Sequence, residues 1–377
     1  MKLIHISDLH LCKRVNEFPM LDDQRYILDK IINIAKETDP DALLIAGDVY
    51  DSHTPPAEAV SVLDEFITRL AGLDIKVFII SGNHDSADRI AFGSRIFSNG
   101  GIYISPVFNG NITPITLDDD YGSVNFYMLP FIKPAHARAT YPDEEILSYT
   151  DAVEAAIRHM GIDTTERNVL ITHQLVTGAV RCDSETISVG GADNVDAAVF
   201  DCFDYVALGH LHGPQSAGRN EVRYSGSPLK YSFSECPHIK SVTVIDIGKK
   251  GDISTDTIPL IPKHDMRELR GSYSDLTLRK NYINTALEDY LHITLTDEED
   301  IPDAISKLRV IYPNIMKLDY DNTRTRHDPT VHIAEAESKS PLELFCDFYK
   351  QRNGRDMTGE ERSFVSDLIE NIWEENA

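Results

Sequence analysis

The chain has 377 residues, of which 42% are hydrophobic and 26% charged, as is ordinary for a globular protein of two or three domains. Its five cysteines form no C-x-x-C pair, which excludes a disulfide framework and a thiolate zinc module and favours a reducing compartment. The formal net charge is −25, with 22 basic and 37 acidic residues in 1–264, 9 and 14 in 265–335, and 5 and 10 in 336–377. No segment therefore offers a general phosphate-binding surface, so contact with nucleic acid would need local patches, metal ions or a partner.

Targeting and nucleotide-binding signals are missing from the sequence. The N-terminus MKLIHISDLH lacks the apolar core of a signal peptide, and no apolar run reaches the ~18 residues of a membrane span. No G-x-x-x-x-G-K-[ST] motif occurs, so this chain is not expected to hydrolyse ATP itself. We therefore expect a cytoplasmic protein with no membrane segment.

Apolar runs alternate with helical patterns in the N-terminal two thirds of the chain, which predicts an α/β fold. Strands are predicted at Lys2–Ser7, Ala42–Ala46, Lys76–Ile80, Val169–Thr172 and Tyr205–Leu208. Helices with one apolar side are predicted from Asp22 towards Pro40, after Pro56 and over Asp151–Met160. From about Val222 shorter strands follow, with a hairpin connection expected at Gly248–Gly251.

Changes in composition divide the chain into three predicted parts. Pro259 and Pro262 mark a linker, so residues 1–262 are expected to form one domain. Residues 263–335 are expected to form a small α+β domain, and residues 336–377 a pair of C-terminal helices.

The pattern of the two C-terminal parts supports this division. In the α+β part, the strand-like stretch YLHITLTD precedes a helix predicted near Asp303–Val310 and a strand near Ile315–Asp319. The last part has helical patterns over Leu342–Gln351 and Thr358–Trp373. Thr358 followed by Glu361 predicts a capping box at the start of the second helix.

Each of the five predicted strands ends in residues typical of metal sites. In chain order these are Asp8 and His10 in DLH, Asp48 and Asp51 in GDVYD, Asn83, His84 and Asp85 in GNHD, His173 in ITHQ, and His210 and His212 in GHLH. Loops that follow parallel strands converge at one edge of a sheet, so we expect these side chains to meet. Two carboxylates, an amide and four imidazoles, leaving His84 aside, suit Mn²⁺, Fe²⁺ or Zn²⁺ better than Mg²⁺ or Ca²⁺. Alternate residues, as in D-x-H and H-x-H, are expected on extended backbone with both side chains pointing to one site.

Taken singly, each motif has an ordinary structural explanation. A D-x-H or H-x-H pair usually lies at the surface, G-N-H often forms only a turn, and an aspartate after a strand commonly caps a helix. His5, inside the first strand, is interpreted as a core histidine. All five motifs nevertheless follow predicted strands in a single order, and this combination favours a metal centre.

The motif order D-x-H, GD-x-x-D, GNH-D, H and GH-x-H resembles the calcineurin-like metallophosphoesterase superfamily. Further stretches resemble the SbcD exonuclease family within it: DLHL, GDVYD, SGNHDS, GHLHGPQ, YSGSPLKYSFSE and, near the C-terminus, SPLELFCDFYKQRNG. The resemblance implies an α/β fold, a β-sandwich flanked by helices, followed by a small α+β cap domain and a C-terminal helix pair. The chain departs from the family at Cys12, where glycine is common, and at Asp51, which is histidine in archaeal and eukaryotic relatives.

The resemblance also implies a centre of two Mn²⁺ ions, although other divalent ions remain open. One ion would be held by Asp8, His10, Asp48 and His212, and the other by Asp48, Asn83, His173 and His210. Asp48 would thus bridge the two ions, as a carboxylate with two oxygens can. His84 would be catalytic, by stabilising a phosphate oxygen or protonating the leaving alkoxide, and Asp51 or Asp85 would orient its ring.

The function that the resemblance implies is a Mn²⁺-dependent DNA nuclease of recombination and repair. It would act as an exonuclease on double-strand ends and as an endonuclease on hairpins and single strands. Two alternatives stay open: a metallophosphodiesterase for small molecules, which would not need the C-terminal parts, and a non-catalytic scaffold.

The partners implied are DNA, a coiled-coil ATPase of the SbcC type, and a second copy of the chain in a heterotetramer. The aromatic residues of the C-terminal helices are interpreted as the surface that docks on the ATPase. Four basic residues near the metal loops, Lys13, Arg14, Arg25 and Arg89, are either DNA contacts or solvated surface.

Overall fold

The computed structural model describes residues 1–185, 194–322, 341–353 and 355–375. It divides into two compact units. The first comprises Met1–Leu269, Asn284–Ile293 and Ile305–Lys317, and the second Arg270–Ile283, Thr294–Ala304 and Leu318–Ala377. Among the described residues, no helix is long and apolar enough to cross a bilayer.

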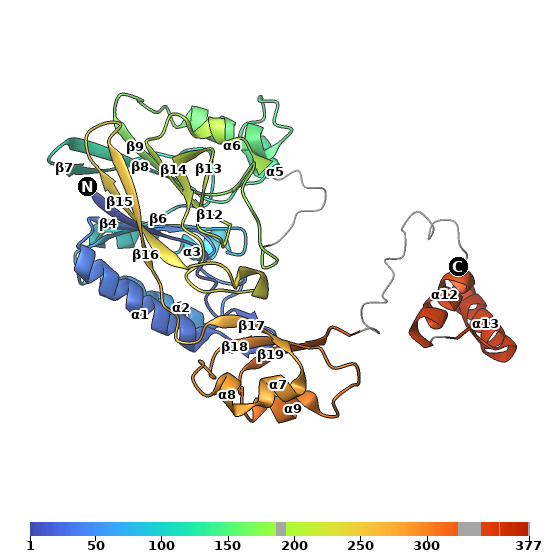
Figure 1. Ribbon diagram of the computed structural model, residues 1–377. Helices are drawn as coiled ribbons and strands as arrows, with labels where there is room; N and C mark the ends of the chain where they lie inside the picture. The colour runs from blue at the N-terminus through green and yellow to red at the C-terminus, as the bar shows by residue number, and fades with distance from the viewer. Residues whose placement is uncertain (186–193, 323–340, 354, 376–377) are drawn as a thin grey trace. The chain divides into compact units, whose positions relative to one another are not determined.

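The first unit contains two six-stranded sheets (Figure 1). The first sheet has the order β16 (Ile253–Pro259), β15 (Ser241–Ile247), β1 (Lys2–Ile6), β4 (Ala42–Ala46), β5 (Lys76–Ile80) and β6 (Ile102–Ile104). The second has the order β13 (Gln215–Ala217), β14 (Arg219–Tyr224), β12 (Tyr205–Gly209), β9 (Arg167–His173), β8 (Gly122–Leu129) and β7 (Ile115–Asp119). The central strands of both sheets are parallel, and β7, β13, β15 and β16 pair antiparallel with their neighbours.

Helices cover the outer face of each sheet, so the unit has four layers (Figure 1). The apolar sides of α1 (Leu21–Thr38) and α2 (Ala57–Ala71) pack on the first sheet, and those of α5 (Pro134–Thr140) and α6 (Tyr149–His159) on the second. A third apolar cluster, with Phe78 stacked on Phe126, fills the space between the sheets. Burial on both faces explains why the central strands are continuous apolar runs.

Shorter elements connect these layers. They are β2 (Arg14–Val15), β3 (Phe18–Pro19), α3 (Ala87–Ile90), α4 (Ser94–Phe97), β10 (Leu175–Val176) and β11 (Asn194–Val195), with 3₁₀ turns at Ser98–Gly100, Ala197–Phe200 and Phe233–Glu235.

The predicted α/β sandwich is confirmed. All five predicted strands and the three predicted helices are present with boundaries within two residues of those predicted, and the Gly248–Gly251 connection joins the antiparallel pair β15 and β16. The hairpin of β7 and β8 was not predicted. Its outer strand alternates half-buried and exposed residues and ends in two aspartates, so its sequence resembles a polar loop.

Beyond β16 the chain forms a three-stranded sheet in the order β17 (Met266–Gly271), β18 (Tyr290–Leu295) and β19 (Ile315–Tyr320), with α7 (Tyr273–Thr277), α8 (Arg279–Tyr282) and α9 (Ala304–Arg309). The helices α12 (Pro341–Asn353) and α13 (Gly359–Glu375) follow. Thr358 and Glu361 form the predicted capping box, through N–H donors 2.8 and 3.3 Å from the partner side-chain oxygens. The domain boundary near 262 stays a prediction, and the one between 335 and 336 lies outside the described residues.

The two sheets are joined at the end of the sandwich where β1 and β9 begin. Arg167, whose side chain is buried, donates to both carboxylate oxygens of Asp119 at 3.0 and 2.6 Å. It also donates to the carbonyl of Gly248, in the first sheet's β15–β16 connection, at 2.8 Å. The Met1 amine donates to the same Asp119 carboxylate at 2.7 Å. These contacts connect one sheet to the other through charge-assisted hydrogen bonds.

Replacing Asp119 with asparagine should lower the free energy of unfolding at pH 7 by about 2 kcal/mol, since it removes charged hydrogen bonds to a buried guanidinium. The Arg167 guanidinium holds the pKa of Asp119 below its usual range. The stabilisation is therefore complete above about pH 4 and is lost as the pH falls through the lowered native pKa. Urea denaturation at pH 7 and pH 3, with Asp118→Asn as control, measures this, and an unchanged stability at pH 7 would contradict it.

Candidate metal centre

The loops that follow β1 and β4 lie side by side and carry the first metal-site residues. The N–H of Asp8 donates to the carbonyl of Gly47, and that of His10 donates to the carbonyl of Asp48, both at 3.0 Å. Asp8, His10 and Asp48 all have left-handed backbone, with φ of 54°, 43° and 47°. Such conformations cost of order 1 kcal/mol or more each and are found mainly at functional sites.

The first cluster of metal-binding side chains consists of Asp8, His10 and His212. Their potential ligand atoms all lie within 4.8 Å of one another, and the three residues are buried. The Nε2 atoms of His10 and His212 are 3.1 Å apart. The Asp8 carboxylate also accepts hydrogen bonds from the Ser7 hydroxyl at 2.5 Å and from the N–H of His210 at 3.1 Å.

The second cluster is built around Asn83. Its side-chain oxygen lies 2.9 Å from Nδ1 of His210 and 3.0 Å from Nε2 of His173. Asp48 lies between the two clusters, because its Oδ2 is 3.4 Å from Nε2 of His173 and 3.7 Å from Nε2 of His10. The structure thus brings all seven predicted ligands close together, and the ligand atoms of Asp8, Asp48 and His173 also lie within 4.8 Å of one another. The division into two ligand sets stays a prediction.

In two of the histidines, a hydrogen bond at Nδ1, the nitrogen that points away from the centre, determines that Nε2 faces the centre. Nδ1 of His173 donates to the carbonyl of Ala46 at 2.8 Å, so Nε2 is the nitrogen that faces Asn83 and Asp48. Nδ1 of His212 lies 2.8 Å from the Ser184 hydroxyl and 3.4 Å from the Glu235 carboxylate, so its Nε2 lone pair faces His10. Histidines that bind metal are commonly oriented in this way.

Charge also indicates a cation site. Burial raises the pKa of Asp8 to about 6. Burial would likewise raise the pKa of Asp48, but His173 and its neighbours hold it well below its usual value. Burial would lower the pKa of His173, yet the Asp48 charge raises it to about 9. Two buried carboxylates therefore need positive charge beside them, and a mixed nitrogen and oxygen donor set suits divalent transition metals.

His84 stands beside this centre, half-buried, with its ring centroid 4.8 Å from that of His10. Its backbone N–H donates to the Asp48 carboxylate at 2.8 Å. Its Nδ1 lies 3.2 Å from the backbone carbonyl of Asp51, so that carbonyl orients the ring.

The carboxylates of Asp51 and Asp85 have other contacts. That of Asp51 pairs with the Lys13 ammonium at 2.6 Å and lies 3.4 Å from Nδ1 of His10. Burial would raise the pKa of Asp51, but His10 and Lys13 lower it. The Asp85 carboxylate accepts from the N–H groups of Gly82, Val49 and Tyr50 at 2.9 to 3.0 Å, and so ties the second and third metal loops together.

One geometric expectation was wrong. Asp8, His10 and His210 have positive φ, of 54°, 43° and 103°, so D-x-H and H-x-H do not lie on extended backbone. His210 and His212 point to different clusters, because the left-handed turn at His210 rotates the chain between them. Cys12, at φ 68°, also occupies a conformation that glycine adopts at lower cost, which explains why glycine is common there in the family.

Three of the four predicted DNA contacts have acidic or carbonyl partners. Lys13 pairs with Asp51, the Arg14 guanidinium donates to the carbonyl of Glu17, and Arg25 lies 3.6 Å from the Asp22 carboxylate. Arg89 is exposed. Their contact with DNA stays a prediction.

Several buried residues that support the centre were not singled out as functional by the sequence. Gln24, on α1, donates to the carbonyls of Leu9 and His10 at 3.2 and 2.7 Å and accepts from the N–H of Cys12 at 2.9 Å. The Tyr231 hydroxyl donates to the same Leu9 carbonyl at 2.5 Å. The available signal was a polar pair, Asp23 and Gln24, on the otherwise apolar side of α1.

Glu235 supports His212 from a fully buried position. It accepts from Ser184 at 2.6 Å and from the Lys240 ammonium at 2.5 Å. Burial would raise the pKa of Glu235, but the Lys240 charge holds it far below its usual range. Lys240 also donates to the carbonyl of His212 at 2.7 Å, so the ion pair supports both ends of this histidine.

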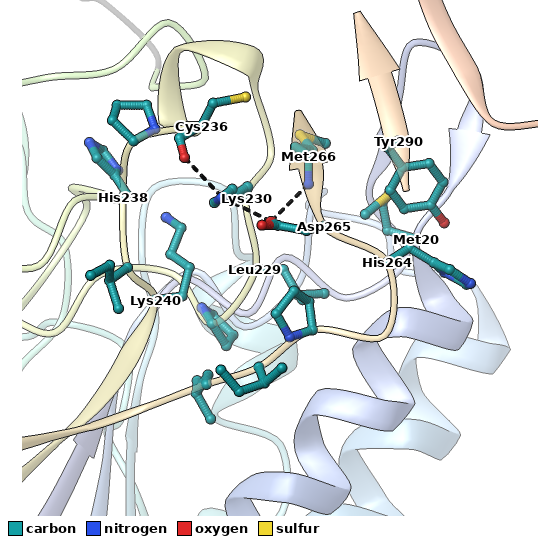
Figure 2. A pocket seen from close by; sticks show the side chains of 16 residues that line it. Met20, Leu229, Lys230, Cys236, His238, Lys240, His264, Asp265, Met266 and Tyr290 are labelled. Atoms are coloured by element: carbon teal, nitrogen blue, oxygen red, sulfur yellow. Dashed lines mark hydrogen bonds and ion pairs between the residues drawn. The ribbon is translucent and has the colours of Figure 1, made fainter. Parts of the chain in front are cut away.

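A pocket of about 280 Å³ has Lys240 among the residues that line it (Figure 2). Its walls come from the loop 228–240, the segment 260–266, Met20 and Tyr290, and they include none of the predicted metal ligands. Figure 2 shows the Lys230 ammonium bridging the Cys236 carbonyl and the Asp265 carboxylate, at 2.9 and 2.8 Å. Both lysines of this pocket, Lys230 and Lys240, therefore already bind carboxylates and carbonyls of the chain itself.

Comparison with known proteins shows which families the chain resembles. Residues 1–214 match the family described as Calcineurin-like phosphoesterase, and residues 262–353 match the Type 5 capsule protein repressor C-terminal domain. Over 373 residues the chain is 33% identical to the SbcD component of the nuclease SbcCD from Staphylococcus epidermidis, with 98% of each chain covered. A solved dimetal phosphatase from Danio rerio matches with a TM-score of 0.44 at 11% identity, over 69% of this chain and 96% of that one.

The paired clusters at the strand ends of a double sheet define a dimetal phosphoesterase, and the sequence match to that family covers more than half of the chain. Similarity along almost the entire length then shows that the chain belongs, within the calcineurin-like phosphoesterases, to the SbcD family. It is accordingly a metal-dependent phosphodiester hydrolase, and the family resemblance stated from its motifs is confirmed.

Replacing Glu235 with glutamine should weaken Mn²⁺ binding roughly tenfold, because residues that orient a metal-bound histidine typically contribute 10- to 100-fold to affinity. The change keeps the shape of the side chain but removes the charge that faces Lys240 and His212. Isothermal titration calorimetry of the metal-free chain with Mn²⁺ measures it. Glu144→Gln, at an exposed ion pair with Arg158, is the control, and equal affinities of the two variants would contradict the role of Glu235.

Proposed function

We propose that this chain is the nuclease component of an SbcCD-type DNA repair and recombination complex in the cytoplasm. It hydrolyses DNA phosphodiesters with two Mn²⁺ ions, as an exonuclease on double-strand ends and an endonuclease on hairpins and single strands. The observation that carries the proposal is the pair of clusters that share Asp48, with His84 beside them.

The proposed roles follow from the contacts. Asp8, His10, Asp48 and His212 hold one ion, and Asn83, His173, His210 and again Asp48 hold the other. When bound, two divalent ions lower the pKa of a water molecule and neutralise charge on the phosphate. The side chains supply fixed donors whose orientation is set before substrate arrives, since the outer nitrogens of His173 and His212 are already hydrogen-bonded.

His84 is the proton donor in this proposal. The Asp51 carbonyl can only accept a hydrogen bond, so Nδ1 keeps its proton and Nε2 is the nitrogen that can release one to the leaving oxygen. Asp51 acts as a positioning residue, because its carbonyl holds His84 while its carboxylate faces His10.

The partners proposed are a coiled-coil ATPase of the SbcC type and a second copy of the chain. Phe345 and Phe348 on α12 and Phe364 and Leu368 on α13 are 41 to 69% exposed, which supports docking of these helices on another protein. Phe92 and Ile96, in the α3–α4 segment after the GNHD loop, are 80 and 74% exposed and support a homodimer contact near the site.

Replacing His84 with alanine should lower the rate of DNA cleavage about 10²- to 10⁴-fold, the usual contribution of a general acid, while two Mn²⁺ ions per chain remain bound. Cleavage of a linear and a hairpin duplex is measured with Mn²⁺, with Mg²⁺ and with EDTA, beside metal content. His159→Ala, at an exposed contact with Glu144, is the matched control.

Cleavage by His84→Ala at the parent rate would contradict the assigned role. Hydrolysis of bis-p-nitrophenyl phosphate with DNA left intact, both alone and with the ATPase partner, would favour the small-molecule phosphodiesterase instead. A parent chain that binds metal and hydrolyses neither substrate would favour the scaffold.

A further inference from the structure

The connection between β8 and α5 carries an aromatic ring that lies against His173 of the Asn83 cluster, and an ammonium group next to that ring. The ring of Phe131, which is half-buried, stands almost perpendicular to that of His173, with an interplanar angle of 87° and centroids 6.3 Å apart. The Lys133 side chain is exposed, and its Nζ lies 6.0 Å from the centre of the Phe131 ring. Neither residue stands out in the sequence, because both occur in an ordinary loop, PFIKP.

The backbone of this connection is fixed to two of the metal loops. The N–H of Phe131 donates to the carbonyl of Ser81, just before Gly82 and Asn83, at 3.0 Å. The next carbonyl, that of Ile132, accepts from the side chain of Gln174, which follows His173, at 3.3 Å. The ring is therefore held at a defined place relative to the metal centre, which an anchored contact to substrate requires.

Lys133 differs from Lys13, the lysine that follows the first metal loop. The Lys13 ammonium lies 2.6 Å from the Asp51 carboxylate and its side chain is mostly buried. Within the described ranges, no carboxylate lies within 4.0 Å of the Lys133 ammonium. In a chain with a net charge of −25, an ammonium without a carboxylate partner among the described residues, next to a ring that packs on His173, attracts a DNA phosphate to this part of the surface.

We propose that Phe131 and Lys133 together bind the DNA strand at the entrance to the metal centre. Phe131 stacks on an unpaired or terminal base, and Lys133 contacts a neighbouring phosphate. The combination of an aromatic ring and a cation is the usual way in which proteins hold single strands with little sequence preference. The inference rests on the proposed nuclease function and names the part of the site that holds its substrate.

The test measures binding of a fluorescein-labelled oligo(dT) by anisotropy, with Mn²⁺ present and His84→Ala as the background so that the strand is not cut. Phe131→Leu keeps an apolar side chain but removes the ring, and should raise the Kd roughly 5- to 100-fold. Phe131→Trp should bind within about twofold of the background, since it restores a stacking surface. On an oligonucleotide of abasic residues, Phe131→Leu should bind as the background does.

Lys133→Gln should weaken binding and reduce the slope of log K against log salt by about 0.7, the value for one phosphate contact on a single strand. Lys133→Arg should restore that slope. Tyr121→Leu and Lys249→Gln are the matched controls, in the β7–β8 and β15–β16 connections at the other end of the sandwich, and should change neither measurement.

The inference is overturned if Phe131→Leu binds oligo(dT) like the background, or if Lys133→Gln keeps the full salt slope. Loss of affinity for the abasic strand in Phe131→Leu would also overturn it, because it would point to a general distortion. A background chain that binds no DNA alone or with the ATPase partner, while the parent hydrolyses bis-p-nitrophenyl phosphate, defeats the proposed nuclease function and the inference with it. The first two outcomes defeat only the inference.

Discussion

Two carboxylates, those of Asp8 and Asp48, are buried within one small volume, where water cannot compensate their charge. The imidazoles of neighbouring histidines compensate part of this negative charge. His10 and His173 lie 3.7 and 3.4 Å from the same oxygen of Asp48, and the pKa of His173 is raised to about 9 by that charge. Bound divalent ions would supply the same compensation, which is why a charge arrangement that would be costly in an ordinary core suits a metal centre.

The geometry of the strand ends follows from this requirement. Left-handed backbone at Asp8, Asp48 and His210 turns their side chains inward directly after the strands. Glycine is needed where the loops approach one another most closely. A Cβ on Gly82 would lie 2.1 Å from the Asp48 carboxylate, and one on Gly209 would lie 1.9 Å from the carbonyl of Ala46. Buried polar residues hold these strained, closely packed loops in place. They are Gln24 and the Glu235–Lys240 ion pair.

Sequence patterns predicted the parts of the site that are local and missed those that depend on distant contacts. The seven candidate ligands could be named because each lies at or shortly after the end of a buried apolar strand, and the parallel arrangement of those strands brings their ends together. The direction in which each side chain points could not be predicted, because an alternating D-x-H or H-x-H pattern does not reveal a positive φ. Glu235 was missed because its partners, Ser184 and His212, come from other loops.

In the fold and in the substrate contacts, too, local features could be predicted from the sequence and features that depend on distant contacts could not. Helices with a continuous apolar side, such as α1 and α2, were predicted closely, whereas the polar edge strand β7 was not. Basic residues near the motifs were natural choices as DNA contacts, yet Lys13 proves to be paired with Asp51. Phe131, with Lys133 next to it, lies against His173 because β8 is the neighbour of β9 in the second sheet, and the sequence does not reveal this pairing.

The central claim is that Asp48 is shared by two metal ions. Crystals of the chain grown with Mn²⁺ and measured at the manganese absorption edge test it most directly. The account predicts two anomalous peaks about 3.5–4 Å apart, one beside His10 and His212 and the other beside Asn83 and His173, with an Asp48 oxygen between them. A single peak, or two peaks of which only one contacts Asp48, would contradict it.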